Sequence, residues 1–170
     1  MEMNFCRRCG TALTAGEPPV YTCEQGHTIF ANAAPTTGIF FVTEDNQVHL
    51  SVRGIEPHKG MLDAFGGFVD GAETLEEAVA RELAEELGLK LGDYTTPEYL
   101  TSGVGFYPYG GEVITVLSAF FWSRLLIDSV APQDDVAEIA SFPLADVPLA
   151  RLHDQDIVAG IKALQAKLLS

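Results

Sequence analysis

At 170 residues, the chain is long enough for one ordinary domain with a small additional module, and its hydrophobic content of 47% is sufficient for a packed core. Its formal net charge of −14 makes nucleic acid an unexpected partner, because phosphate backbones bind to basic surfaces. The first residues contain no apolar signal-peptide core, and no apolar stretch is long enough to span a bilayer. We therefore expect a cytoplasmic protein without a membrane partner.

All three cysteines lie near the start of the chain. Cys6 and Cys9 form a C-x2-C pair, and Cys23 is followed by His27 at C-x3-H spacing. Two such pairs of ligands suit a tetrahedral structural Zn²⁺ site, which would also stabilise a module too small to fold on its core alone. The alternative is that the thiols bind no metal in a reducing cytoplasm and that His27 is a surface residue.

Apolar patterns predict a sheet in the remainder of the chain. Residues 36–43, T-T-G-I-F-F-V-T, indicate a buried strand, and residues 47–53 alternate between apolar and polar side chains. The turn residues between the two segments predict a hairpin. From Asp154 onward, apolar residues recur at helical spacing and predict a C-terminal helix packed on the sheet. Further strands are predicted over residues 98–103, 112–123 and 138–142.

The most informative segment is an acidic helix predicted between Thr74 and Gly88. Thr74 and Glu77 have the spacing of a capping box, and Gly88 follows the last apolar position. One stripe of this helix is apolar and should face the core. It consists of Leu75, Val79, Leu83 and Leu87.

Three carboxylates, Glu82, Glu85 and Glu86, share a neighbouring face of this helix. Like charges at these spacings destabilise a helix by roughly 0.2–0.5 kcal/mol per pair, and Arg81 is the counter-charge within the helix. From charge alone, the face is either solvated or binds a cation. Mg²⁺ prefers carboxylate and phosphate oxygens, so it is the cation that this cluster suggests.

The full spacing favours the second interpretation. Gly67, Glu73 and the run Arg81-Glu82-Leu83-Ala84-Glu85-Glu86-Leu87-Gly88-Leu89 resemble the Nudix box, Gx5Ex7REUxEExGU, where U is an aliphatic residue. Every fixed position matches. The resemblance implies an α/β fold, a Nudix-like α/β/α sandwich with a mixed sheet, over residues 34–170. It also implies a hydrolase that cleaves a nucleoside diphosphate linked to another group X, using Mg²⁺ or Mn²⁺.

The resemblance also assigns roles by position. Arg81 would orient the carboxylates through ion pairs, Glu73 would support it, and the Gly67 carbonyl would contact the metal. Mg²⁺ or Mn²⁺ binding falls to the three helix carboxylates, Glu82, Glu85 and Glu86.

Residues 1–33 resemble the zinc ribbon that precedes the catalytic domain in some Nudix proteins. That ribbon usually has a second C-x2-C pair, whereas this chain has His27 as the natural replacement for the fourth cysteine. Four protein ligands leave no open coordination position, so the expected role of the zinc is structural.

Basic and aromatic residues are the expected substrate contacts. Arg53 and Lys59 would bind phosphate, or else be solvated surface cations. A turn-rich segment after residue 103 carries three aromatic side chains that would stack on a base or, alternatively, cover the sheet. They are Phe106, Tyr107 and Tyr109.

A further metal ligand or general base is expected from residues 134–138, with Glu138 favoured over Asp134 and Asp135. The resemblance leaves X and the oligomeric state open, with a homodimer among the expectations. One rival is a non-catalytic nucleotide sensor or interaction module with a Nudix fold, which would have no reason to retain a repulsive carboxylate cluster. The other rival is a zinc-ribbon nucleic-acid binder, which the negative charge disfavours.

Overall fold

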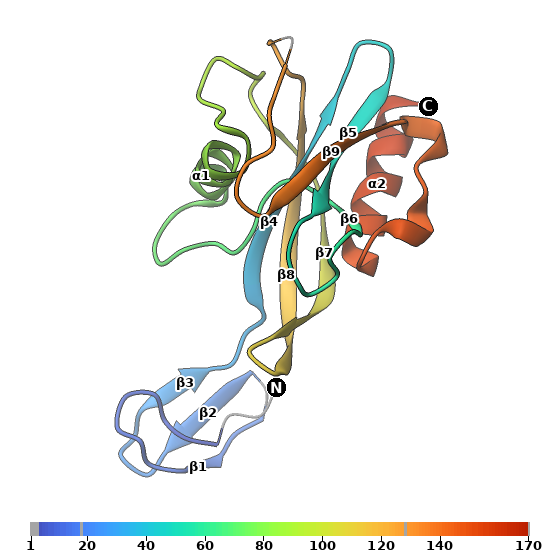
Figure 1. Cartoon of the computed structure of the whole chain (residues 1–170). Helices are drawn as coiled ribbons and strands as arrows, with labels where there is room; N and C mark the ends of the chain where they lie inside the picture. The colour runs from blue at the N-terminus through green and yellow to red at the C-terminus, as the bar shows by residue number, and fades with distance from the viewer. Residues whose placement is uncertain (1–3, 18, 128, 170) are drawn as a thin grey trace. The chain divides into compact units, whose positions relative to one another are not determined.

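The computed structural model describes residues 4–17, 19–127 and 129–169, and the chain divides into two compact units between Ala33 and Ala34. In the first unit, three short antiparallel strands form a sheet in the order β1-β2-β3 (Figure 1). Its small core contains Cys6, Cys23 and Ile29, with Leu13 packed against them. The strands are β1 (Leu13–Ala15), β2 (Val20–Cys23) and β3 (Thr28–Phe30).

The second unit is built on a six-stranded sheet in the order β6-β5-β4-β8-β7, with β9 paired to β5. β4 and β8 are parallel, and the other strand pairs are antiparallel, so the sheet is mixed. The strands are β4 (Ala34–Val42), β5 (Gln47–Arg53), β6 (Leu62–Asp63), β7 (Glu98–Tyr109), β8 (Glu112–Ser123) and β9 (Val136–Pro143).

Two helices cover opposite faces of this sheet (Figure 1). α1 (Leu75–Leu87) buries Val79, Leu83 and Leu87 against the β4 face that carries Ile39 and Phe41. On the other face, α2 buries an apolar stripe against β4, β5 and β8. Two 3₁₀ turns, Leu144–Asp146 and Leu149–Arg151, precede α2 (Gln155–Leu168). The expected α/β/α sandwich with a mixed sheet is confirmed.

The acidic helix has the ends that the sequence predicts. The Glu77 amide donates to Thr74 Oγ1 at 3.2 Å, and the Thr74 amide donates to Glu77 Oε2 at 2.8 Å, which completes the capping box. Gly88 ends the helix in the left-handed conformation, with φ of 65°. Because the capping box and Gly88 set the first and last residues of α1, they also set the positions of the three Nudix-box carboxylates along the helix.

β7 is the main departure from the predicted elements. It continues to Tyr109 through the segment that was expected to be a turn-rich loop. Its residues pair with β8 along the whole length, from Glu98 opposite Trp122 to Tyr109 opposite Glu112. The chain reverses at Gly110 and Gly111, which have φ of 60° and 86°, as a tight hairpin turn requires.

Of the helices in the described part of the chain, none is long and apolar enough to cross a membrane.

Candidate active site

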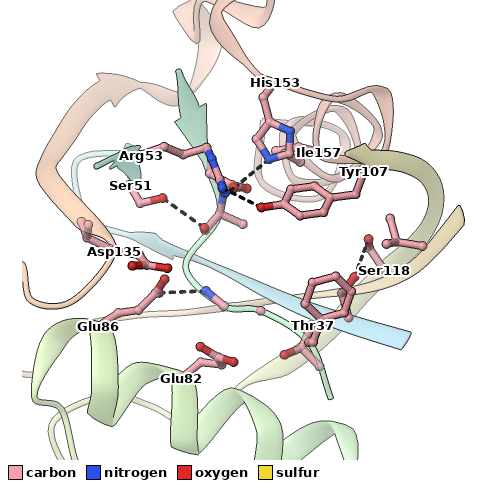
Figure 2. A pocket seen from close by; sticks show the side chains of 18 of the residues that line it. Thr37, Ser51, Arg53, Glu82, Glu86, Tyr107, Ser118, Asp135, His153 and Ile157 are labelled. Carbon is pink, nitrogen blue, oxygen red and sulfur yellow. Dashed lines mark hydrogen bonds and ion pairs between the residues drawn. The ribbon is translucent and has the colours of Figure 1, made fainter. Parts of the chain in front are cut away.

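A pocket of about 450 Å³ lies in the second unit (Figure 2). Its walls come from the sheet strands β4, β5, β7 and β8, from α1 and the turn that precedes it, and from the beginning of α2. One end is acidic and contains Glu82, Glu86 and Asp135, and the other end contains Arg53 and His153. The pocket therefore joins the Nudix-box helix to residues that lie far away in the sequence.

Glu86 is the most enclosed carboxylate at the acidic end, with 8% of the residue exposed. Burial raises the pKa of Glu86 to about 8, and the nearby charges of Glu82, Asp63 and Asp135 act in the same direction. The Gly66 amide donates to Glu86 Oε2 at 2.9 Å and partly offsets this effect. Burial also raises the pKa of Glu82, whereas the Glu85 side chain is half-exposed.

Two glycines bring the backbone against these carboxylates. A Cβ atom on Gly67 would lie 2.6 Å from Glu82 Oε1, so a side chain here would displace that carboxylate. Gly66 has φ of 135°, and a Cβ atom on it would lie 2.3 Å from the Thr37 carbonyl oxygen. The turn can take this path only with glycine at position 66, whereas at position 67 an added side chain would require the Glu82 carboxylate to move.

Arg81 joins the acidic residues of the Nudix box to one another. Its guanidinium forms ion pairs with Glu73 at 2.7 Å, Glu82 at 2.8 Å and Glu85 at 3.1 Å. It also donates to the Phe68 carbonyl at 2.9 Å, and its hydrogen bonds lower the pKa of Glu73. Arg81 therefore fixes Glu82 relative to the turn before the helix.

The opposite end of the pocket contains a network that the sequence did not indicate. Asp63 Oδ2 accepts hydrogen bonds from Arg53 Nη1 at 2.8 Å and His153 Nε2 at 2.7 Å. Arg53 Nη2 also donates to the Tyr107 hydroxyl at 2.8 Å, and His153 stacks on His58 with ring centroids 5.0 Å apart. No role was expected for Asp63 or His153, and His153 has no local motif that could have indicated it.

The other expected substrate contacts are divided between the pocket and its surroundings. Tyr107 and Tyr109 line the pocket and pack edge-on against Phe68, at centroid distances of 5.8 and 5.9 Å. Phe106 is exposed and does not line the pocket, because successive side chains of a strand point to opposite faces. Lys59 is also exposed and outside the lining.

The segment before β9 contributes different residues from the one expected. Asp134 and Asp135 line the pocket, and Asp135 lies next to Glu86 (Figure 2), whereas Glu138 is outside the lining. The sheet explains this difference, because Glu138 lies within β9, opposite Val52, on the face of the sheet that α2 covers and not on the α1 face. Asp135 precedes the strand, and its carbonyl accepts from the Gly54 amide at 2.7 Å.

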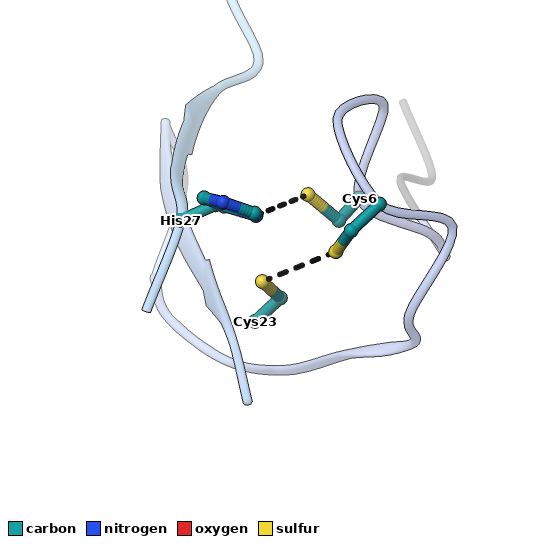
Figure 3. A group of neighbouring side chains, drawn as sticks. Cys6, Cys23 and His27 are labelled. Carbon is teal, nitrogen blue, oxygen red and sulfur yellow. Dashed lines mark hydrogen bonds between the residues drawn. The ribbon is translucent and has the colours of Figure 1, made fainter. Parts of the chain in front are cut away.

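In the first unit, the four expected zinc ligands converge (Figure 3). The ligand atoms of Cys6, Cys9, Cys23 and His27 all lie within 4.8 Å of one another. Cys9 Sγ lies 3.8 Å from Cys23 Sγ, and Cys6 Sγ lies 3.7 Å from His27 Nδ1. Zn–S bonds of 2.3 Å give a tetrahedron with edges of about 3.8 Å, so these separations fit a tetrahedral metal.

Known structures share this fold. A Nudix hydrolase from Nitrosomonas europaea superposes on 96% of this chain and 89% of its own, with a TM-score of 0.66 and 24% identity. The Nudix domain of Shewanella oneidensis NrtR, solved in complex with ADP-ribose, covers 82% of this chain and 90% of its own, with a TM-score of 0.61 and 23% identity. These likenesses concern the fold.

Sequence comparison identifies the family. An ADP-ribose pyrophosphatase of Methanocaldococcus jannaschii is 31% identical over 69% of this chain and 66% of its own length. An NAD-capped RNA hydrolase, NudC, of Pseudomonas aeruginosa is 29% identical over 81% of this chain and 46% of its own. The chain thus spans less than two thirds of these relatives. The family model of the NUDIX domain matches residues 33–160, and the chain therefore belongs to the Nudix family.

Proposed function

We propose that the chain is a hydrolase that uses Mg²⁺ or Mn²⁺ to cleave the diphosphate of a nucleoside diphosphate linked to a group X. The observation that carries this proposal is the gathering of Glu82, Glu86 and Asp135 at one end of a pocket large enough for a nucleotide fragment. The names of the relatives, an ADP-ribose pyrophosphatase and an NAD-capped RNA hydrolase, support the same reaction class.

The acidic end has the chemistry of a divalent-cation site. Its donors are hard carboxylate oxygens, which Mg²⁺ and Mn²⁺ prefer. The raised pKa of Glu86 is the mark of buried carboxylates without a counter-charge, and a cation would supply one. When bound, the metal would neutralise the diphosphate and lower the pKa of a water molecule. The residues that would hold it are Glu82, Glu85, Glu86 and the carbonyl of Gly67.

The protein's own groups would orient the reaction. Arg81, tied to Glu73 and to the Phe68 carbonyl, holds the Glu82 carboxylate in place. A carboxylate at the acidic end accepts the proton of the attacking water, and Asp135, which lines the pocket, is better placed for this role than Glu138, which does not. Attack on the phosphorus in line with the bridging oxygen then releases the two halves of the substrate.

The substrate is a nucleotide, and its X group is the open part of the proposal. Tyr107 and Tyr109 offer aromatic surface in the pocket, while Arg53 is already paired with Asp63. An RNA end with an NAD cap carries the same diphosphate as NAD. RNA of this kind therefore belongs among the test substrates, although the net charge of the chain argues against general nucleic-acid binding.

We also propose that the first unit holds a structural Zn²⁺ ion through Cys6, Cys9, Cys23 and His27. The separations of the sulfur and nitrogen atoms match a tetrahedral site. With four protein ligands the ion has no open position, so its contribution is to the stability of this unit.

The test of the proposed reaction is a substrate panel with Mg²⁺ and then with Mn²⁺. The panel contains ADP-ribose, NADH, NAD, FAD, dinucleoside polyphosphates, nucleoside triphosphates and NAD-capped RNA. We expect cleavage of at least one compound, a loss of about 100-fold or more in Glu86→Gln, and wild-type rates in the matched surface variant Glu138→Gln. Equal rates for wild type and Glu86→Gln would contradict the proposal.

A further inference from the structure

Thr37 on β4 has a buried hydroxyl group without a hydrogen-bond partner. The residue is 4% exposed, and its Oγ1 atom is one of three buried side-chain polar atoms that lack a partner in the described part of the chain. Buried hydroxyls are almost always hydrogen-bonded, because leaving one unpaired costs about 1–3 kcal/mol. Thr37 lines the pocket, so a bound ligand can supply the missing partner.

The adjacent residue, Thr36, provides an internal comparison. The Thr36 hydroxyl donates to Ser118 Oγ at 2.7 Å, and Ser118 donates in turn to Asp156. Successive side chains of a strand point to opposite faces, so Thr36 lies toward the α2 side and Thr37 toward the α1 side. Both threonines lie on β4 and line the pocket, but only the Thr36 hydroxyl has a hydrogen-bond partner within the protein.

Thr37 lies against the Nudix-box turn. Its amide donates to the Gly67 carbonyl at 2.9 Å, and its own carbonyl is the atom that a Cβ on Gly66 would strike. Figure 2 shows its side chain at the same end of the pocket as Glu82. The hydroxyl is therefore located where the proposed function places the diphosphate.

The groups at the acidic end of the pocket indicate which kind of ligand atom the Thr37 hydroxyl would bind. Ionised Glu82 and Glu86 offer only acceptor atoms, so they reach a phosphate only through a cation. The Thr37 hydroxyl is a donor and can bond to a phosphate oxygen directly. We propose that Thr37 is a diphosphate-binding residue whose hydroxyl donates to a phosphate oxygen of the bound substrate, an inference that rests on the proposed function.

The test compares Thr37→Val, Thr37→Ser and Thr36→Val. Binding of α,β-methylene-ADP in the presence of Mg²⁺ is measured by calorimetry, because this probe carries a methylene analogue of the diphosphate common to all candidate substrates, and its P–C–P bridge is not hydrolysed. We expect Thr37→Val to bind about 10- to 100-fold more weakly, the loss of one hydrogen bond to a charged group. Thr37→Ser keeps the hydroxyl and should bind within about threefold of wild type.

Thermal unfolding without divalent cations gives a second test. If the Thr37 hydroxyl had a purely structural role, Thr37→Val would lower the Tm. Thr37→Val removes an unsatisfied group and should raise the Tm by about 2–4 °C, whereas Thr36→Val loses a formed hydrogen bond and should lower it by a similar amount. Wild-type affinity in Thr37→Val, or a Tm that falls as in Thr36→Val, would overturn the inference about Thr37 and leave the proposed function standing. Absence of probe binding in the wild-type protein would overturn the proposed function as well.

Discussion

At the residue scale, the acidic end of the pocket combines burial with like charge. Glu86 lies beneath the Gly66 amide and close to Glu82 and Asp135, and its pKa is about 8. Burying a carboxyl group among other carboxylates, so that it stays protonated at pH 7, lowers the stability of a helix. A bound cation would compensate for this cost, so the arrangement suits a metal site. The carboxylates that destabilise α1 without a metal are therefore the same groups that would bind the metal.

The raised pKa of Glu86 predicts a pH dependence for the metal-free protein. Between the unfolded-state pKa of about 4.5 and the folded-state value, the folded protein binds the additional proton, so the free energy of unfolding falls as pH rises. From pH 5 to pH 8 the decrease attributable to Glu86 should reach about 3 kcal/mol. Urea denaturation at both pH values, without divalent cations, measures it.

Glu86→Gln is the control for this prediction, because it keeps the shape of the side chain and removes the titration. The variant should lose most of the decrease between pH 5 and pH 8. An unchanged pH dependence in the variant would show that other groups cause it.

The sequence predicted the residues of the Nudix box and missed those that chain folding brings to them. The glycine, glutamate and arginine positions of the box are recognisable because one turn and one helix hold them at fixed spacing. Asp63 and His153 meet through β6 and the segment before α2, 90 residues apart, which no local pattern encodes. Glu138 was favoured over Asp135 because a sequence does not say where a strand begins relative to a pocket.

At the element scale, α1 is the platform of the acidic end. Its apolar stripe anchors it to the sheet, its N-terminal capping box sets where it begins, and Arg81 ties its second turn to the preceding turn. The carboxylates are thus held on a rigid element with an independent connection to the glycine turn. Rigid support of this kind keeps ligand oxygens in place.

Loss of the helix cap should weaken this platform. Thr74→Ala removes the acceptor for the Glu77 amide and should lower the free energy of unfolding by about 1 kcal/mol, with a Tm lower by about 2–4 °C. Thr74→Ser keeps an acceptor oxygen and should stay within a few tenths of a kcal/mol of wild type. Equal loss in both variants, measured by urea denaturation, would argue against the cap as the cause.

The boundaries of α1 and β5 were predictable because capping residues and strict alternation mark them. The extent of β7 was not, because the glycine and proline residues within it are typical of turns. Pairing with all of β8 overrides these local preferences, and the Gly110-Gly111 pair is the signal that marks the real turn. The error had a functional consequence, since alternation along β7 separates Phe106 from Tyr107 and Tyr109.

At the scale of the whole molecule, the sandwich brings distant segments to one pocket. α1 covers one face of the sheet and α2 the other, and the pocket receives residues from both. The family resemblance was sufficient to predict this layering. At the Arg53 end of the pocket an ion pair with Arg53 balances the Asp63 carboxylate, whereas at the α1 end burial and nearby carboxylates raise the pKa of Glu86.

The first unit should depend on zinc more than the second does. Its core has few buried apolar residues, so removal of the ion by a chelator should increase amide exchange in residues 4–33 and leave protection of β4 and β8 unchanged. Hydrogen exchange measured by mass spectrometry separates the two regions. Cys23→Ser should reproduce the effect without a chelator, and full protection of the first unit after metal removal would contradict the proposed site.

The most direct test of the central claim is a crystal structure with Mn²⁺ and α,β-methylene-ADP. We expect anomalous density for Mn²⁺ between the carboxylates of Glu82 and Glu86 and the diphosphate, in the pocket seen in Figure 2. Manganese bound elsewhere, with the diphosphate away from α1, would contradict the assignment of this pocket as the catalytic centre.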